Sequence, residues 1–183
     1  MVALASSLNQ PMRHANQLEV PMSPMTCRVL VADDSEDERF LIQLFLRFVP
    51  DIRLIGWVRD GEETLARLRG VGSFGDRSRF PYPDLLLLDY EMPGMNGLEV
   101  LALLEDETIR PRIVLWSNAL ELVDQELARG LGADLVCQKP TDSLEMLTVM
   151  NRAGWRALAA LPPISPPRGG SPIANRPATV GSF

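Results

Sequence analysis

Five short apolar runs alternate with amphipathic stretches along the middle of the chain. The runs are Cys27–Ala32, Ile52–Val58, Leu85–Leu88, Ile113–Trp116 and Leu135–Cys137. The third run consists of four consecutive leucines, which is typical of a parallel strand covered on both faces. Because a stretch of helical spacing follows each run, the pattern predicts a doubly wound α/β fold with a five-stranded parallel sheet.

Apolar residues at helical spacing predict which side of each intervening helix faces the sheet. The expected inward positions are Leu41, Leu44, Phe45 and Phe48 in the first helix, Leu65 and Leu68 in the second, Leu98, Leu101 and Ala102 in the third, Val123 and Leu127 in the fourth, and Leu144, Leu147, Trp155 and Leu158 in the last. Pro50 stops the first helix, and Asp142 with Glu145 has the spacing of a capping box at the start of the last.

The two ends of the chain differ from its middle. Residues 1–25 show no periodicity and residues 161–183 are rich in Pro, Gly and Ser, so we expect a disordered leader and tail around one domain at 26–160. The net charge of −6 argues against a broad nucleic-acid or anionic-membrane surface. No apolar run has the length of a membrane span, and the first ten residues do not resemble a signal peptide, which indicates a cytoplasmic protein.

The cysteines and the histidine exclude several classes of site. Cys27 and Cys137 lie in apolar, strand-like contexts, which favours buried reduced thiols over a disulfide or a zinc site. His14 is the only histidine of the chain, so His-based metal clusters and His-dependent catalytic triads are excluded.

A set of complementary polar residues follows the predicted strands. Asp33 and Asp34 end the first, Asp89 the third and Ser117 the fourth, and Lys139 follows the fifth. The carboxyl ends of parallel strands meet at one edge, where ligands bind. Clustered carboxylates repel one another, and a hard divalent cation such as Mg²⁺ relieves that repulsion. The site could then accept a phosphoryl group, with the ionised Asp89 as nucleophile.

Four motifs around these residues resemble the receiver domain of two-component response regulators. They are VLVADDSEDE, LLLLDYEMPGMNGLEVL, VLWSNA and CQKP, and the resemblance covers residues 26–160. It implies a flavodoxin-like sheet with strand order 2-1-3-4-5. It also implies that Asp89 is the phosphoacceptor, that Asp34 binds Mg²⁺ directly and Asp33 largely through water, and that the backbone carbonyl of Glu91 completes the metal shell.

The resemblance assigns the remaining residues to a conformational switch. Ser117 is similar to the hydroxyl that bonds the phosphoryl group, Lys139 to the residue that pairs with it, and Lys139–Pro140 to a cis peptide bond of the family. Val136 stands where the family usually has Tyr or Phe, which puts the usual form of the switch in doubt. Trp116 is a candidate substitute, although its apolar context is typical of a core residue.

The resemblance implies a stand-alone regulator that is not a dedicated enzyme. A sensor histidine kinase or phosphotransfer protein would be the phosphodonor, and a downstream protein would receive the signal by contact. One alternative is a haloacid-dehalogenase-type enzyme, but its D-x-D nucleophile stands on the first strand. A second is a receiver fold used purely for binding. Asp34 or Ser35 could also be simply the N-cap of the first helix.

A glycine motif and a loop remain between the second helix and the third strand. Gly70 to Gly75 match G-x-G-x-x-G, but a helix precedes them, whereas the dinucleotide-binding fingerprint requires a strand. We therefore predict a long loop over Gly70–Pro83. It resembles an insertion in the stand-alone regulators associated with bacterial phytochrome-type kinases.

Overall fold

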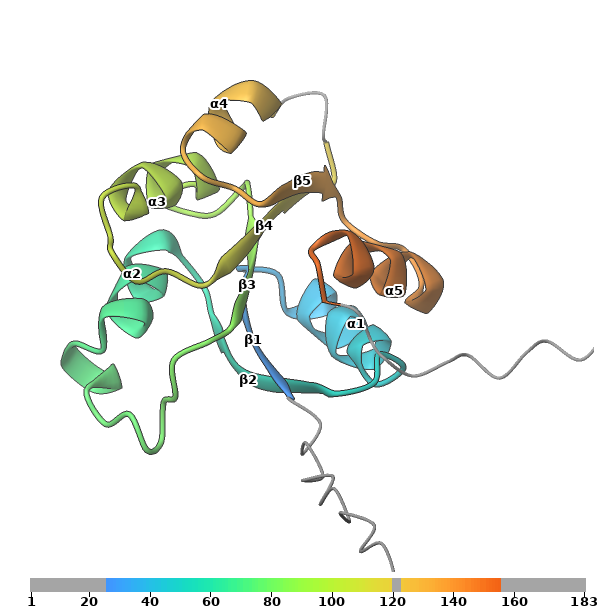
Figure 1. Cartoon of the computed structure of the whole chain (residues 1–183), viewed down its shortest axis with the longest axis horizontal. Helices are drawn as coiled ribbons and strands as arrows, with labels where there is room; N and C mark the ends of the chain where they lie inside the picture. The colour runs from blue at the N-terminus through green and yellow to red at the C-terminus, as the bar shows by residue number, and fades with distance from the viewer. Residues whose placement is uncertain (1–25, 120–122, 156–183) are drawn as a thin grey trace, which may run out of the picture.

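The computed structural model describes residues 26–119 and 123–155, which form one parallel sheet between two layers of helices (Figure 1). The strand order is β2-β1-β3-β4-β5, so the predicted topology is confirmed. The predicted leader and tail lie outside the described residues, as do 156–160 of the predicted domain. The strands are β1 (Cys27–Ala32), β2 (Ile52–Val58), β3 (Leu85–Asp89), β4 (Arg112–Ser117) and β5 (Leu135–Gln138), and the helices are α1 (Glu36–Leu46), α2 (Gly61–Arg69), α3 (Gly97–Leu104), α4 (Gln125–Gly130) and α5 (Ser143–Arg152).

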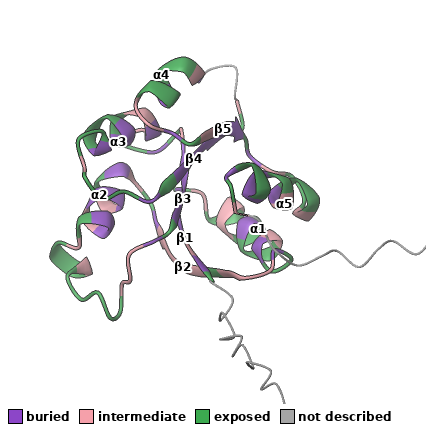
Figure 2. Cartoon of the chain, viewed as in Figure 1, coloured by how far each residue is buried: buried purple, intermediate pink, exposed green. Residues whose placement is uncertain are grey.

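Alternation along the strands divides the core into two layers. In β3, Leu86 and Leu88 pack with α2, α3 and α4, whereas Leu85 and Leu87 pack with α1 and α5. Figure 1 shows α1 and α5 on one face of the sheet and α2 and α3 on the other. The central strands β1, β3 and β4 are largely buried, the edge strand β2 is mostly half-buried and the outer helix faces are exposed (Figure 2), as expected for a sheet covered on both sides.

Side-chain caps fix where the helices begin. Ser35 caps α1, because its Oγ accepts the Glu38 N–H, and this decides between the two capping candidates. Asp142 caps α5 and accepts the N–H groups of Leu144 and Glu145. The capping box predicted there is incomplete, because the Glu145 carboxylate accepts from Thr141 rather than from the Asp142 backbone.

The face predicted for α1 is wrong for three of its four residues, and only Phe45 is half-buried and packs against the core. Ile42 and Leu46 are buried, whereas Leu41 and Leu44 are 46% and 37% exposed, and Phe48, beyond the helix end, is 66% exposed. Apolar side chains of α1 itself project from most of its sides, so periodicity alone could not select the inward face. The Ser35 cap and the contact with the sheet select it instead.

The other helix faces are predicted with mixed success. Leu65 and Leu68 of α2 and Leu101 of α3 are buried as predicted, and Val123 is buried just before α4. The prediction is wrong for Ala102, Leu127 and Leu144, which are exposed. The buried face of α5 consists of Met146, Val149 and Met150, which stand at i, i+3 and i+4 and form a second set of apolar residues at helical spacing. Trp155 lies beyond the end of that helix, and Leu158 lies outside the described residues.

The loop predicted over Gly70–Pro83 contains a single 3-10 turn and is anchored by a buried arginine. Arg67 of α2 is 1% exposed, and its guanidinium donates to the carbonyl oxygens of Phe80 and Pro81 at 2.9 and 2.8 Å. The same guanidinium lies 5.4 Å from the centre of the Phe80 ring, a cation–π contact. The loop therefore has a fixed path over the end of α2.

Candidate functional site

Three carboxylates meet one ammonium group at the carboxyl edge of the sheet. Lys139 Nζ lies 3.0 Å from Asp33 Oδ2 and 3.0 Å from Asp89 Oδ2, and it also donates to Glu38 Oε2. Oxygens of the three carboxylates lie within 4.8 Å of one another. We call these four residues, Asp33, Glu38, Asp89 and Lys139, the acidic cluster.

Sheet pairing places the members of the cluster. Asp89 is the last residue of β3, and Asp33 follows β1 with its N–H bonded to the Val58 carbonyl at the end of β2. Lys139 follows β5, and its N–H donates to the Ser117 carbonyl at the end of β4. Backbone pairing thus continues one residue past the strands and brings side chains that are distant in sequence to one edge.

Burial makes this cluster electrostatically demanding. Asp33 is fully buried, Asp89 is 4% exposed and Lys139 is 9% exposed. Desolvation raises the pKa of Asp89 to about 6, against the opposing charge of Lys139, and it raises the pKa of Asp33 as well. Burial disfavours the charged Lys139, but the carboxylates around it outweigh burial and raise its pKa. One cation therefore does not fully compensate three acids.

The hydroxyl predicted for this edge is also in place. Ser117 ends β4 and is 1% exposed, and its Oγ accepts the N–H of Ala119 at 3.0 Å. The next residue, Asn118, donates from Nδ2 to Glu38 Oε1 at 2.7 Å. The start of the loop after β4 is thus tied to α1 through Glu38.

Asp34 and Glu91 occupy a different position from the acidic cluster. Asp34 is exposed, and its carboxylate does not belong to the group of three acids found among the described residues. It lines an open pocket beside the cluster with Glu91 and Asn96. The structure therefore brings Asp33, Asp89 and Lys139 together and leaves Asp34 and Glu91 at the rim.

Comparison with known proteins decides the family. A family model described as the response regulator receiver domain matches residues 29–151, a range that contains the whole cluster and Ser117. The chain belongs to this family. The receiver domain accounts for the strand order and for the acids at the carboxyl edge of the sheet.

Curated relatives match the receiver domain over part of their length. The nitrate/nitrite response regulator protein NarL of Escherichia coli K12 is 29% identical over 151 residues, 82% of this chain and 65% of NarL. A protein-glutamate methylesterase/protein-glutamine glutaminase of Myxococcus xanthus is 35% identical over 117 residues, 62% of this chain and 30% of that protein. The chain thus spans less than two thirds of these relatives.

Solved structures of phytochrome-associated regulators resemble this receiver domain. The phosphorylated cyanobacterial phytochrome response regulator RcpA is 28% identical, with a TM-score of 0.57 over 74% of this chain and 98% of RcpA. The bacteriophytochrome response regulator RtBRR is 26% identical, with a TM-score of 0.60 over 76% of this chain and 86% of RtBRR. The predicted resemblance to phytochrome-associated regulators is therefore confirmed, since such regulators are among the solved structures similar to this chain.

Glu38 is the cluster residue that our sequence analysis missed. The spacing Ser35-x-x-Glu38 is that of a capping box, in which the glutamate would accept the Ser35 N–H. In the receiver domain Asp33 Oδ1 accepts that N–H at 2.9 Å, so Glu38 is released to reach Lys139 and Asn118. An acid one turn after an acidic pair was the available signal.

Two expectations about the switch residues have clear outcomes. The described residues contain no cis peptide bond, so the prediction of a cis Lys139–Pro140 bond is wrong, and this bond has the trans form that X–Pro bonds ordinarily prefer. Trp116 is fully buried, as a core residue would be, and Val136 is 3% exposed. The Trp116 ring is therefore not exposed at the surface, and position 136 carries no aromatic ring.

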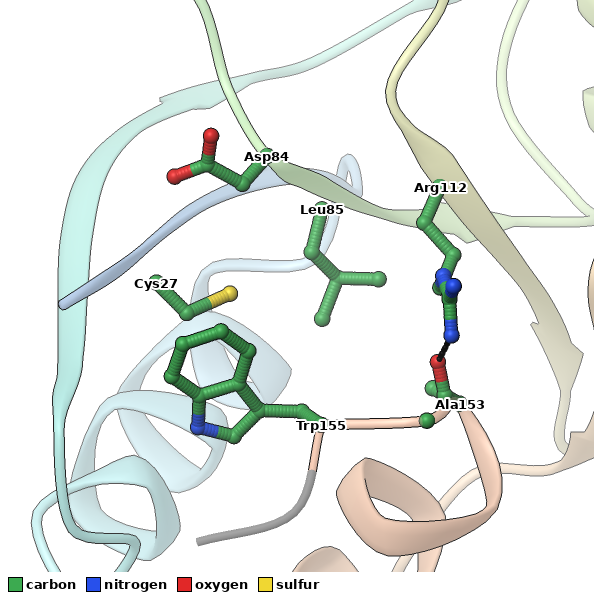
Figure 3. A pocket seen from close by; sticks show the side chains of 7 residues that line it. Cys27, Asp84, Leu85, Arg112, Ala153 and Trp155 are labelled. Atoms are coloured by element: carbon green, nitrogen blue, oxygen red, sulfur yellow. Dashed lines mark hydrogen bonds between the residues drawn. The ribbon is translucent and has the colours of Figure 1, made fainter. Parts of the chain in front are cut away.

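A second pocket lies at the opposite, amino-terminal edge of the sheet and carries no comparable chemistry (Figure 3). It has a volume of about 260 Å³ and lies beside Trp155. Burial raises the pKa of its Cys27 thiol to about 12, and its ionisable groups already have partners, since Arg112 donates to Ala153 and Asp84 pairs with Arg28. Within residues 26–119 and 123–155, no helix is long and apolar enough to cross a membrane.

Proposed function

We propose that the receiver domain accepts a phosphoryl group on Asp89 from a sensor histidine kinase or a phosphotransfer protein. The observation that carries this proposal is the position of the Asp89 carboxylate, which ends a central strand, is almost buried and lies 3.0 Å from Lys139 Nζ. Burial of a charge opposes folding even where a partner offsets part of the cost, so a buried carboxylate with a shifted pKa is typical of a functional site. The family membership of the chain supports the same role.

The residues of the cluster would divide the transfer between them. With a pKa of about 6, Asp89 is mostly ionised at neutral pH and can act as the nucleophile. A carboxylate oxygen of Asp89 would bond to phosphorus as the bond from phosphorus to the donor breaks, and the donor would leave with that electron pair. Lys139 would pair with the phosphoryl oxygens, and the Ser117 hydroxyl would donate a hydrogen bond to one of them.

The donor set at this edge fits a divalent metal ion. The oxygens of Asp33, Glu38 and Asp89 lie close together, and hard cations prefer oxygen ligands. Asp33 and Asp89 belong to this group, and we assign Mg²⁺ to them together with Asp34 and the backbone carbonyl of Glu91 from the adjoining pocket. When bound, Mg²⁺ offsets the carboxylate repulsion and the charge of the phosphoryl oxygens. Desolvation, and to a smaller extent the charge of Asp33, raises the pKa of Asp89, so the buried carboxylate lacks full charge compensation without the metal.

The signal would leave the domain through protein contact. We propose a stand-alone cytoplasmic regulator that carries out its own phosphoryl transfer and slow dephosphorylation, without nucleic-acid or membrane binding and without a further enzymatic activity. Phosphorylation would shift a two-state surface around the fourth and fifth β/α units, which are β4, α4, β5 and α5. Because Val136 is not aromatic, the change should concentrate in the loop after β4.

Labelling with acetyl phosphate tests the proposal. Intact-mass measurement of the protein with acetyl phosphate and Mg²⁺ should show one added phosphoryl group, absent in Asp89→Asn and absent without Mg²⁺. The exposed Asp106→Asn, which makes the same chemical change elsewhere, should label like the wild type. An unlabelled wild type would instead support a receiver fold used only for binding.

A further inference from the structure

Glu38 joins the acidic cluster to the loop after β4. One carboxylate oxygen, Oε2, accepts from Lys139 Nζ, and the other, Oε1, accepts from Asn118 Nδ2 at 2.7 Å. Lys139 is expected to contact a phosphoryl group on Asp89. Asn118 is the next residue after Ser117, whose hydroxyl is expected to bond the same group. Glu38 therefore bonds to two elements that must respond to phosphorylation.

Lys139 already has three carboxylate partners in the unphosphorylated domain. Its ammonium group donates hydrogen bonds to Asp33 and Glu38 and forms an ion pair with Asp89 at 3.0 Å. A phosphoryl group on Asp89 replaces the charged Asp89 carboxylate as a partner and adds several acceptor oxygens beside Lys139, so these oxygens compete with Asp33 and Glu38 for its ammonium group. The Glu38 side chain is 28% exposed, whereas those of Asp33 and Asp89 are 0% and 6% exposed. Glu38 can return to water most easily.

We propose that Glu38 is a latch, which is closed on Lys139 and Asn118 in the unphosphorylated domain and is released when Asp89 is phosphorylated. This inference rests on the proposed function. Release frees the Asn118 amide, so the loop after β4 loses its tie to α1 as Ser117 turns toward the phosphoryl group. The family usually has an aromatic residue in its switch at position 136, where this chain has Val. Release of Glu38 would take over part of that role by freeing the loop after β4. Glu38 is a positioning residue, acting through Lys139 and Asn118.

The latch predicts that losing the Glu38 charge speeds phosphorylation. Glu38→Gln frees Lys139 and removes a negative charge near the incoming phosphoryl group. We expect the initial rate of labelling by acetyl phosphate with Mg²⁺ to rise by about tenfold. Glu36→Gln is the matched control, because it makes the same change two residues away on an exposed side chain of the same helix. It should label at the wild-type rate. A Glu38→Gln rate equal to that of Glu36→Gln, or below that of the wild type, would overturn the latch.

Hydrogen exchange tests the second contact of the latch without any phosphoryl transfer. In the unphosphorylated, Mg²⁺-free protein, Asn118→Ala and Glu38→Ala should each speed amide exchange at Ala119, whose N–H is held by Ser117 Oγ. Glu36→Ala should leave that exchange unchanged. Unchanged exchange at Ala119 in Asn118→Ala would refute the latch even if Glu38 variants fail to fold.

The two experiments separate the latch from the proposed function. If the wild type takes no label while Ala119 exchanges as predicted, the proposed function is wrong and the contact through Glu38 remains. If the wild type labels on Asp89 but the Glu38 variants behave like their Glu36 controls, only the latch is wrong.

Discussion

Replacing Asp89 with Asn should stabilise the metal-free protein, although it removes the proposed phosphoacceptor. The carboxylate is 4% exposed and its pKa is raised from 3.8 to about 6, chiefly by desolvation. Asn has nearly the same shape and carries no charge. Lys139 keeps Asp33 and Glu38 as partners after the substitution, so no buried charge is left unpaired.

The size of the effect follows from the pKa. Each pKa unit corresponds to about 1.4 kcal/mol, so a shift from 3.8 to about 6 sets an upper bound of about 3 kcal/mol on the destabilisation at neutral pH. The favourable interaction of Asp89 with Lys139 is already included in this net shift. We expect Asp89→Asn to unfold with a free energy about 1–3 kcal/mol higher than that of the wild type at pH 7.

The pH dependence has a definite sign. A folded-state pKa above the unfolded value means that the folded protein takes up a proton as the pH falls from about 7 to about 4, while the unfolded chain does not. The wild type therefore gains stability from Asp89 over that window, and the advantage of Asp89→Asn should shrink by pH 5. Asn cannot titrate, so the variant lacks this contribution.

Urea denaturation in EDTA at pH 7 and pH 5 measures both quantities, with Asp106→Asn as the exposed control. Midpoints should be compared at equal slopes, so that a change in the unfolded state is not mistaken for stability. A variant that is less stable than the wild type at pH 7, or an advantage that does not narrow at pH 5, would refute the reasoning.

Three further predictions concern the metal, the thiols and the core. Mg²⁺ at about a hundredfold above its dissociation constant should stabilise the fold by roughly 2.7 kcal/mol, and Asp34→Ala should lose that rise in melting temperature; a full response in the variant would place the metal elsewhere. Burial raises the pKa values of Cys27 and Cys137 to about 12 and about 11, so neither thiol should react with iodoacetamide at pH 8 until urea unfolds the protein; rapid native labelling would contradict their burial. Ile42→Ala should lower the free energy of unfolding by about 2–4 kcal/mol and Leu41→Ala by less than about 1 kcal/mol, and equal losses would contradict the observed face of α1.

The strands were predictable because each is a short apolar run with polar residues at its carboxyl end. The predicted Leu85–Leu88 became Leu85–Asp89 and Ile113–Trp116 became Arg112–Ser117, differences of one residue at the ends. The helix faces were less predictable, since α1 is apolar on most sides and α5 packs with Met146 and Met150. In both helices more than one set of apolar residues has helical spacing, so periodicity alone does not select the inward face.

The site was predictable to the extent that it lies on strand ends. Parallel pairing carries Asp33, Asp89, Ser117 and Lys139 to one edge, so their types and order were sufficient. Glu38 comes from a helix, and its role depends on Asp33 accepting the Ser35 N–H, a competition that the sequence does not show. The open position of Asp34 is likewise a property of side-chain geometry.

The central claim is that Asp89 itself receives the phosphoryl group, and borohydride trapping tests it most directly. The protein is treated with acetyl phosphate and Mg²⁺, then with borohydride, which reduces an aspartyl phosphate to homoserine. The peptides that contain the ends of β1 and β3 are then sequenced by mass spectrometry. The account predicts homoserine at position 89 and aspartate at positions 33 and 34. Homoserine at another aspartate, or none at position 89 in protein that carries the label, would contradict it.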